Sequence, residues 1–434
     1  MFKKSFIQNI ALVFISTFLA LFIINAGLEI HFLSKNKIAE NLKREMIKRG
    51  VNYDNRYIKE VVLSVRDEGE ECFAAMCSNI ILRAGWTKKL VPLSGIPNTR
   101  TINCNELGIF SEYKSDRYGF NNPDQSWEIF SNEKNLDFIL LGDSFTQGSC
   151  VPQKYTIAGQ IRNFGYSALS LGCSANGPLA SLAALREYGK LGSTKNIVYI
   201  FTAGNDIYDL VEEEKTILNK YFEDESFLQN LSSDNNKLKV VSHLKKFHDE
   251  RLYSYFHNND MNLVMRNITE SENQFSVHRI FKLTHLRWKI GKADLVGNWY
   301  RYNKFKKIKA NYESNEYKKN MSKFYNVVQK IQDTAREQNA KFIVAYLYSP
   351  NRDNKAMTDA AKSFNFLFKE KILKNLNDME IQVIDLESAL KKIEDQDSLY
   401  PLGDAKTLGM HFGHFSPKGY EIIAEEITKV IQNQ

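Results

Sequence analysis

A short apolar run that ends abruptly in small and polar residues constrains the fold most. The stretch reads FILLGDSFTQG, from Phe138 to Gly148. A continuous apolar run bounded by glycine is typical of a strand covered on both faces, as in the centre of a parallel sheet. The turn from Gly142 to Ser144 is then predicted at the carboxyl edge of that sheet, which is where ligands bind in open α/β folds.

Strands and helices alternate along the chain from about residue 136 onward. Further strands are predicted at 168–171, 196–201, 341–347 and 381–386, and helices at 157–163, at 179–191 and after Ser416. This alternation predicts an α/β fold with a parallel sheet and helices on both of its faces.

The composition is typical of a globular protein with a substantial core. The chain has 434 residues, of which 43% are hydrophobic and 12% aromatic, and this content argues against intrinsic disorder. Acidic residues are interspersed with the lysines and arginines that give a net charge of +7, so we expect no nucleic-acid partner. The five cysteines include no CxxC pair, and we expect no structural metal site.

A mostly apolar segment near the N-terminus predicts a membrane anchor. It has no charge from Ser5 to Leu28 and follows Lys3 and Lys4, and it is long enough to cross a hydrocarbon core of about 30 Å. A cleavable signal peptide is the alternative. We therefore predict a transmembrane helix within residues 1–33. Since a short basic tail before a first helix usually stays inside, we expect a single-pass membrane protein whose main domain is extracytoplasmic, in the periplasm.

The rest of the chain divides into an accessory region and a main domain. Residues 34–133 show weak periodicity and several turns, which predicts a linker and accessory region. Residues 134–434 carry the strand and helix alternation, interrupted at 211–335 by a polar insertion that is predicted to be mostly helical. Basic and aromatic residues alternate over 285–311. That pattern is typical either of a lid or membrane-surface patch or of an exposed helical excursion whose aromatics pack on the main body.

Three segments far apart in the sequence place reactive side chains at the predicted sheet edge. Ser144 lies at a strand-to-helix turn, which suits an exposed nucleophile. Asn205 follows the strand predicted at 196–201 and supplies a side-chain amide. His414 lies just before the last helix and offers a base for the serine. Together they predict nucleophilic catalysis.

In this order the three segments resemble the blocks of the SGNH hydrolase superfamily, also called GDSL esterases and lipases. The first block is matched by GDSFTQG at 142–148, the third by GND at 204–206, and the last by H-x-S-x-x-G-Y at 414–420. The resemblance implies a three-layer α/β/α sandwich with a flavodoxin-like parallel sheet, over about 134–210 and 336–432.

The resemblance also implies roles for single residues. His414 takes the proton of Ser144, which attacks an ester carbonyl. The oxyanion is held by backbone N–H groups of Ser144 and Ala175 and by the side chain of Asn205. Gly177 is the fallback backbone donor. The supporting residues are Asp143, Asp206 and His411.

Two positions depart from the family pattern. Ala175 stands where the family has glycine, and its N–H can still donate if its φ stays negative. His411 stands three residues before His414, where the family commonly has the Asp that orients the base. Either Asp404 or a backbone carbonyl is expected to orient His414 instead. Loss of activity is the third alternative.

Three functions from different classes fit these residues. The first is a serine esterase that removes a short acyl group, such as acetyl, from a glycan of the cell envelope. The second is an O-acyltransferase for a surface polysaccharide, which uses the same Ser and His and takes its acyl group from a membrane partner. The third is a non-catalytic glycan-binding or assembly protein. We expect no metal and no organic cofactor in any of them.

Two cysteines are expected near the predicted site. Cys150 lies six residues after Ser144, and Cys173 lies in the loop that holds Ala175. If the domain is extracytoplasmic, the two are candidates for a disulfide with a Cα to Cα distance below about 7 Å. Two separate buried thiols are the alternative.

Overall fold

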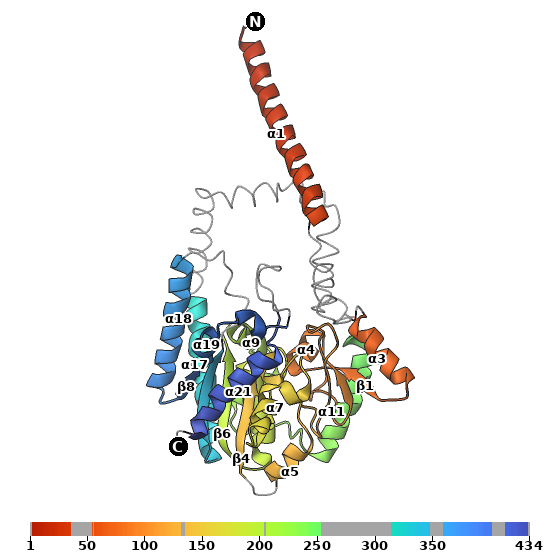
Figure 1. The fold of residues 1–434 in the computed structure, drawn as a ribbon, viewed down its shortest axis with the longest axis vertical. Helices are drawn as coiled ribbons and strands as arrows, with labels where there is room; N and C mark the ends of the chain where they lie inside the picture. Colours follow the sequence, from red (N-terminus) through yellow and green to blue (C-terminus); the bar gives the residue numbers. More distant parts are fainter. Residues whose placement is uncertain are drawn as a thin grey trace.

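A five-stranded parallel sheet is the centre of the molecule (Figure 1). The structure is a computed structural model and describes residues 2–35, 54, 56–131, 135–203, 205–252, 314–347, 359–401 and 413–432. The strands are β4 (Leu136–Gly142), β5 (Ala168–Ser170), β6 (Thr194–Thr202), β7 (Lys341–Leu347) and β8 (Gln382–Asp385). They pair in the order β5-β4-β6-β7-β8, and every neighbouring pair is parallel. Counted along the chain this is the flavodoxin-like order 2-1-3-4-5, which confirms the predicted α/β sheet.

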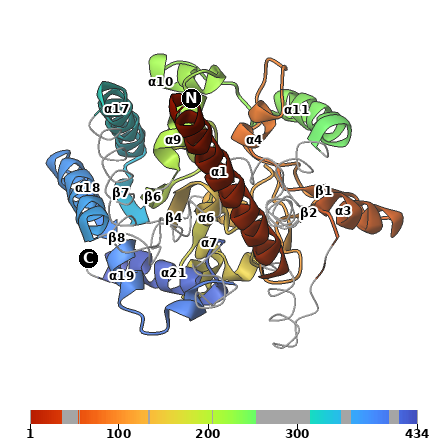
Figure 2. The same ribbon diagram turned by 90° about the horizontal axis from the view of Figure 1, so that it is seen from above.

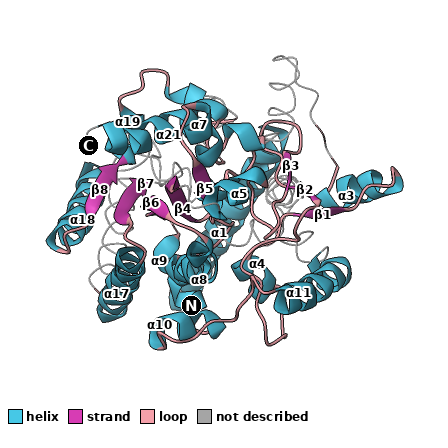
Figure 3. Cartoon of the chain, turned by 90° about the horizontal axis from the view of Figure 1, so that it is seen from below, coloured by secondary structure: helices cyan, strands magenta, loops and turns pink. Residues whose placement is uncertain are grey.

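The central strands have continuous apolar runs because their residues alternate between two separate cores. In β4, Ile139 and Leu141 face one core, whereas Phe138 and Leu140 face the other. The first core includes α8 (Pro178–Tyr188), α17 (Asn315–Glu337) and α18 (Asp359–Asp378). The second includes α7 (Ile157–Asn163), α19 (Leu386–Lys391) and α21 (Pro417–Gln432). Figures 2 and 3 show α17 on one side of the sheet and α7, α19 and α21 on the other, so the sheet is covered on both faces.

Local sequence signals set where the helices around the site begin. Helix α7 is capped by the Thr156 side chain, which accepts a hydrogen bond from the Gly159 N–H. Proline is the first residue of both α8 and α21, where its missing N–H costs nothing. The Ser416 hydroxyl accepts from the Gly419 N–H at 3.3 Å, and His414 lies three residues before Pro417, the start of α21.

The accessory region forms a small sheet of its own beside β5 (Figure 3). Strand β1 (Cys72–Ala74) pairs in parallel with β2 (Arg100–Ile102), which pairs antiparallel with β3 (Glu112–Lys114). Its helices are α3 (Ile58–Asp67), α4 (Ser78–Arg83) and α5 (Gln125–Ser131). The predicted boundary at residue 134 falls between α5 and β4.

The described part of the predicted insertion is helical. It contains α10 (Lys220–Glu223), α11 (Asp234–Phe247) and most of α17, which packs on the main sheet, and the end of α9 (Asp206–Glu213) runs into it. Residues 285–311, with the basic and aromatic pattern, lie outside the described residues. The lid or surface patch therefore stays a prediction.

The N-terminal segment is a helix, α1 (Phe2–Lys35). The described residues contain no helix that is both long enough and apolar enough to span a membrane. The predicted segment is thus a helix, and no membrane span is found among its described residues.

Candidate active site

Ser144 lies at a tight turn between β4 and α6 (Ser144–Gln147). Asp143 caps this short helix, because its carboxylate accepts a hydrogen bond from the Phe145 N–H at 3.0 Å. Gly142 has a φ of 143°, and a Cβ there would lie 2.3 Å from Thr146 Oγ1, so only glycine fits the end of the strand. Ser144 itself is half-buried. The turn thus places Ser144 at the carboxyl edge of the sheet, which is where the sequence predicts it.

His414 reaches the same edge from the other end of the chain. Its ring centroid lies 5.0 Å from that of Phe145, the residue next to Ser144. The loop that carries it is fixed by Ser416, whose hydroxyl donates to the Ser398 carbonyl at 2.6 Å. The Tyr420 hydroxyl donates to the Ser149 carbonyl at 3.2 Å. The residues of the first and last predicted blocks are therefore brought together.

A buried glutamate of the accessory region clamps His414. Glu106 Oε1 lies 3.0 Å from His414 Nδ1, and Glu106 Oε2 accepts from the His414 backbone N–H at 2.6 Å. The side chain of Glu106 is 6% exposed and that of His414 is 19% exposed. Gly413 makes this approach possible, since it has a φ of 88° and a Cβ there would lie 2.5 Å from Glu106 Oε2. The sequence analysis missed Glu106, which is 308 residues before His414.

The Glu106 contact changes the acid-base property of the histidine. Burial by itself lowers the pKa of His414. The negative charge of Glu106 and its hydrogen bond, with a smaller contribution from Asp143, outweigh burial and leave the pKa of His414 above its usual value. Glu106, not a backbone carbonyl, therefore occupies Nδ1 of the base. Asp404 and His411, the other residues predicted around His414, lie outside the described residues.

The predicted backbone donors of the oxyanion hole differ in availability. Among the described residues, the N–H groups of Ser144 and Ala175 have no hydrogen-bond partner, so both are free to donate. The Gly177 N–H already donates to Glu213 Oε1 at 2.7 Å, which removes it as the fallback donor. Ala175 has a φ of 61°, so the condition of a negative φ is not met. This left-handed conformation is one that glycine adopts freely, and for alanine it costs about 1 kcal/mol.

Asn205 is oriented by two carboxylates. Its Nδ2 donates to Asp143 Oδ2 at 2.9 Å and to Asp209 Oδ2 at 3.3 Å. Both amide hydrogens of Asn205 are thus engaged by carboxylates. Asp206 lies behind this group, where its Oδ2 accepts from the Tyr199 hydroxyl at 2.7 Å and from the Thr202 N–H at 3.0 Å. Asp206 therefore supports the turn and does not face Ser144.

A second group from the accessory region supports the Ala175 loop. Asn79 Nδ2 donates to the Ala175 carbonyl at 2.6 Å and to Glu213 Oε1 at 3.0 Å. Glu213 also accepts from the Leu179 N–H at 2.8 Å, and its burial raises its pKa to about 8. On the other side, Gln147 Oε1 accepts from the Ser174 N–H at 3.0 Å. These contacts hold Ala175 in its left-handed conformation, and the sequence analysis missed Asn79, Glu213 and Gln147.

Four cysteines form two disulfides, but not the predicted one. Cys77 pairs with Cys173, with Cα atoms 5.5 Å apart, and Cys104 pairs with Cys150, with Cα atoms 4.9 Å apart. Cys150 and Cys173 are therefore both bonded to the accessory region and not to each other. Cys72 is a buried free thiol. Each disulfide therefore joins the accessory region to one loop of the site, although the two loops also touch each other through the Ser149 and Ser174 hydroxyls, 3.1 Å apart.

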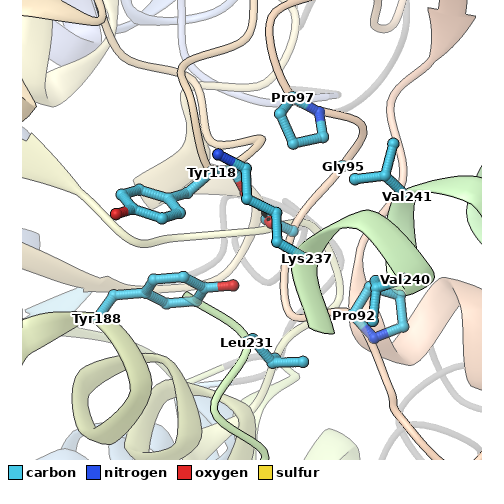
Figure 4. A pocket seen from close by; sticks show the side chains of 10 residues that line it. Pro92, Gly95, Pro97, Tyr118, Tyr188, Leu231, Lys237, Val240 and Val241 are labelled. Atoms are coloured by element: carbon cyan, nitrogen blue, oxygen red, sulfur yellow. Dashed lines mark hydrogen bonds between the residues drawn. The ribbon is translucent and has the colours of Figure 1, made fainter. Parts of the chain in front are cut away.

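Two cavities lie away from these residues. One, of about 20 Å³, has room for a single water. Figure 4 shows Lys237 of α11 beside Tyr118, with Tyr188 of α8 below them. The other is a groove of about 300 Å³ near Trp86 and Phe247. Neither is lined by Ser144, Asn205 or His414.

No family model matches the chain, and no curated protein is significantly similar to it.

Proposed function

We propose that this chain is a serine esterase of the SGNH type, with Ser144 as nucleophile, His414 as base and Glu106 as the carboxylate that orients the base. The observation that carries the proposal is the 3.0 Å contact between His414 Nδ1 and the buried Glu106. A carboxylate only accepts hydrogen bonds, so the proton of the neutral imidazole sits on Nδ1. The lone pair of Nε2 is then available for the serine proton.

The reaction follows from these positions. Nε2 of His414 takes the hydroxyl proton while Ser144 Oγ attacks the ester carbonyl. The N–H groups of Ser144 and Ala175, with the Asn205 amide, stabilise the oxyanion. The protonated His414 then gives its proton to the leaving alcohol. Water, deprotonated by the same nitrogen, attacks the acyl-enzyme and releases the acid, which restores Ser144.

We propose a short acyl group on a cell-envelope glycan as the substrate. The polar character of the insertion at 211–335 supports this choice, because a long-chain lipid calls for a broad apolar entrance. The two disulfides support an extracytoplasmic location, since disulfides form and persist in oxidising compartments. A glycan of the envelope is available to an enzyme in that location.

Labelling with a fluorophosphonate tests the nucleophile directly. The full chain is reacted with the probe, digested, and analysed by mass spectrometry. We expect the label on Ser144, and its loss in Ser144→Ala. Ser131→Ala is the matched control, because this hydroxyl only donates to the Glu128 carbonyl at the end of α5. A label that persists in Ser144→Ala contradicts the proposal.

Turnover on matched esters tests the substrate. We expect kcat/KM for acetylated sugars and p-nitrophenyl acetate to exceed that for long-chain acyl esters. A clear preference for the long chains contradicts the glycan proposal and leaves the serine mechanism in place. Addition of an acceptor glycan separates hydrolysis from acyl transfer, since only a transferase yields the acylated acceptor.

A further inference from the structure

The Cys104–Cys150 disulfide lies directly against the proposed acid-base pair. Cys104 is two residues before Glu106, and Cys150 is six residues after Ser144. Cys150 Sγ lies 3.5 Å from His414 Nδ1, the nitrogen that Glu106 holds. One bond thus connects the segments that carry the nucleophile and the carboxylate, at the histidine between them.

Glu106 lies in a loop that has little regular structure to hold it. The loop spans 103–111, between β2 and β3, and is closed at its neck where the Asn103 N–H donates to the Ser111 carbonyl at 2.8 Å. Near its tip, the Gly108 carbonyl accepts from the Asp54 N–H at 2.7 Å. Within the described residues, the disulfide is the only covalent cross-link of this loop to the main domain. The position of this loop therefore determines whether the Glu106 carboxylate contacts His414.

We propose that Cys104 and Cys150 are positioning residues for the base: their disulfide holds Glu106 against His414, so that esterase activity requires the oxidised protein. The inference rests on the proposed function. A thiol reductant opens the bond by exchange: two RSH become RSSR, the S–S bond breaks, and each cysteine sulfur gains one proton. The loop at 103–111 is then free to move, and the Cys150 thiol competes with Glu106 for Nδ1.

The second disulfide provides the contrast. Cys77 and Cys173 are both fully buried, whereas Cys104 is partly exposed. Exchange needs access of a thiolate to a sulfur atom, so a mild reductant opens Cys104–Cys150 first. Cys77–Cys173 joins the accessory region to the Ala175 loop and makes no contact with His414 among the described residues.

The pH profile of kcat/KM separates positioning from a general structural effect. The charged groups that raise the pKa of His414 are Glu106 and Asp143. Without Glu106 at Nδ1, burial dominates, the pKa of His414 falls, and the acidic limb of the profile moves to lower pH. A merely destabilised protein has fewer active molecules and an unmoved limb.

The experiment compares the full-length double variants C104S/C150S and C77S/C173S on p-nitrophenyl acetate. For C104S/C150S we expect a loss in kcat/KM of about tenfold or more, with the acidic limb shifted to lower pH as in Glu106→Gln. Added to Glu106→Gln, the two Ser substitutions cause little further loss, because both changes remove one function. For C77S/C173S the limb stays in place. The inference is overturned if the acidic limb of C104S/C150S does not move, or if its loss in kcat/KM multiplies with the loss caused by Glu106→Gln.

If C104S/C150S does not fold, reduction of the folded wild-type protein tests whether activity depends on the Cys104–Cys150 disulfide. Dithiothreitol is used with EDTA, because the two sulfurs and a His414 nitrogen lie within 4.8 Å of one another in the disulfide form, and reduction would free both sulfurs to bind stray metal. Alkylation and mass spectrometry identify which bond has opened. We expect activity to fall as Cys104–Cys150 opens and to return on reoxidation. Unchanged turnover after that bond has opened overturns the inference alone, whereas an oxidised protein with neither turnover nor Ser144 labelling overturns the proposed function.

Discussion

The two sides of the candidate site depend on the accessory region through different physics. On the acid-base side, Glu106 meets His414 in a charged hydrogen bond beside a disulfide. On the oxyanion side, Asn79 fixes the Ala175 loop through amide and carbonyl contacts. The Glu106 carboxylate contacts His414 and raises its pKa, whereas Asn79 contacts the Ala175 carbonyl and Glu213. We therefore expect changes on the first side to move the pH profile, and changes on the second side to lower the rate at every pH.

The largest loss of activity is expected from substitution of Ser144 or His414, the proposed nucleophile and base. Ser144→Ala and His414→Ala each remove the group that forms or activates the nucleophile, so we expect kcat to fall by about 10⁴-fold or more. Circular dichroism and thermal melting verify that the fold persists, which we expect because Ser144 begins the short helix α6, His414 lies in the loop before α21, and neither is fully buried. Near-wild-type turnover in either purified variant contradicts the assignment.

Glu106→Gln isolates the acid-base side. We expect a loss in kcat of about 10²- to 10⁴-fold, because the amide does not stabilise the imidazolium that forms. Activity requires neutral His414 and rises with pH through its pKa. Since Glu106 raises that pKa, its neutralisation moves the acidic limb of kcat/KM to lower pH.

Glu128→Gln is the matched control for this variant. Glu128 is exposed and pairs with Arg117 at 3.3 Å, away from the site. Its kcat/KM and its acidic limb should match those of the wild type. A limb that stays in place in Glu106→Gln shows that another group, such as Asp404, sets the pKa of the base.

Asn205→Ala isolates the oxyanion side. We expect a loss in kcat of about 10²-fold, as for one donor among three, with the acidic limb of the profile unmoved. Asn163→Ala is a control on α7, where the amide contacts only its own helix and the preceding turn. A shift of the acidic limb in Asn205→Ala contradicts the expectation that only changes on the acid-base side move the pH profile.

The main sheet was predictable because its signals are local. The apolar run of β4 and the glycine at 142 fix a buried strand and a tight turn without reference to the rest of the chain. Ser144 and His414 were predictable for a similar reason, because each lies in a short block next to a strand or helix end. The structure also brings these blocks to one edge, as parallel strands require.

The residues that complete the site were not predictable, because long-range contacts place them. Nothing in the sequence around Glu106 marks it as a partner of a histidine 308 residues away. Its position depends on the pairing of β2 with β3 and on disulfide connectivity, which spacing alone does not determine. The one available signal was that Cys77 and Cys104 lie in the accessory region while Cys150 and Cys173 lie in site loops. Pairing across the regions, instead of between the loops, would have brought Glu106 to the site.

The smallest effect is expected from Ala175→Gly, and it concerns stability. Ala175 is held at a φ of 61°, where an L side chain costs about 1 kcal/mol and glycine costs little. Glycine also gains freedom in the unfolded chain, which offsets part of the relief. We expect the free energy of unfolding to rise by up to about 1 kcal/mol, with kcat/KM close to that of the wild type, because the backbone N–H is retained.

An alanine-to-glycine substitution in a helix should lower the free energy of unfolding instead of raising it, and it serves as the control. Ala183 is fully buried inside α8, where the backbone is helical and glycine costs about 1 kcal/mol relative to alanine. Urea titrations of the two variants therefore compare one chemical change at two backbone conformations. If Ala175→Gly destabilises the protein as much as Ala183→Gly does, the loop is not strained at Ala175. The alanine at position 175 would then have to be explained by its side chain and not by the backbone.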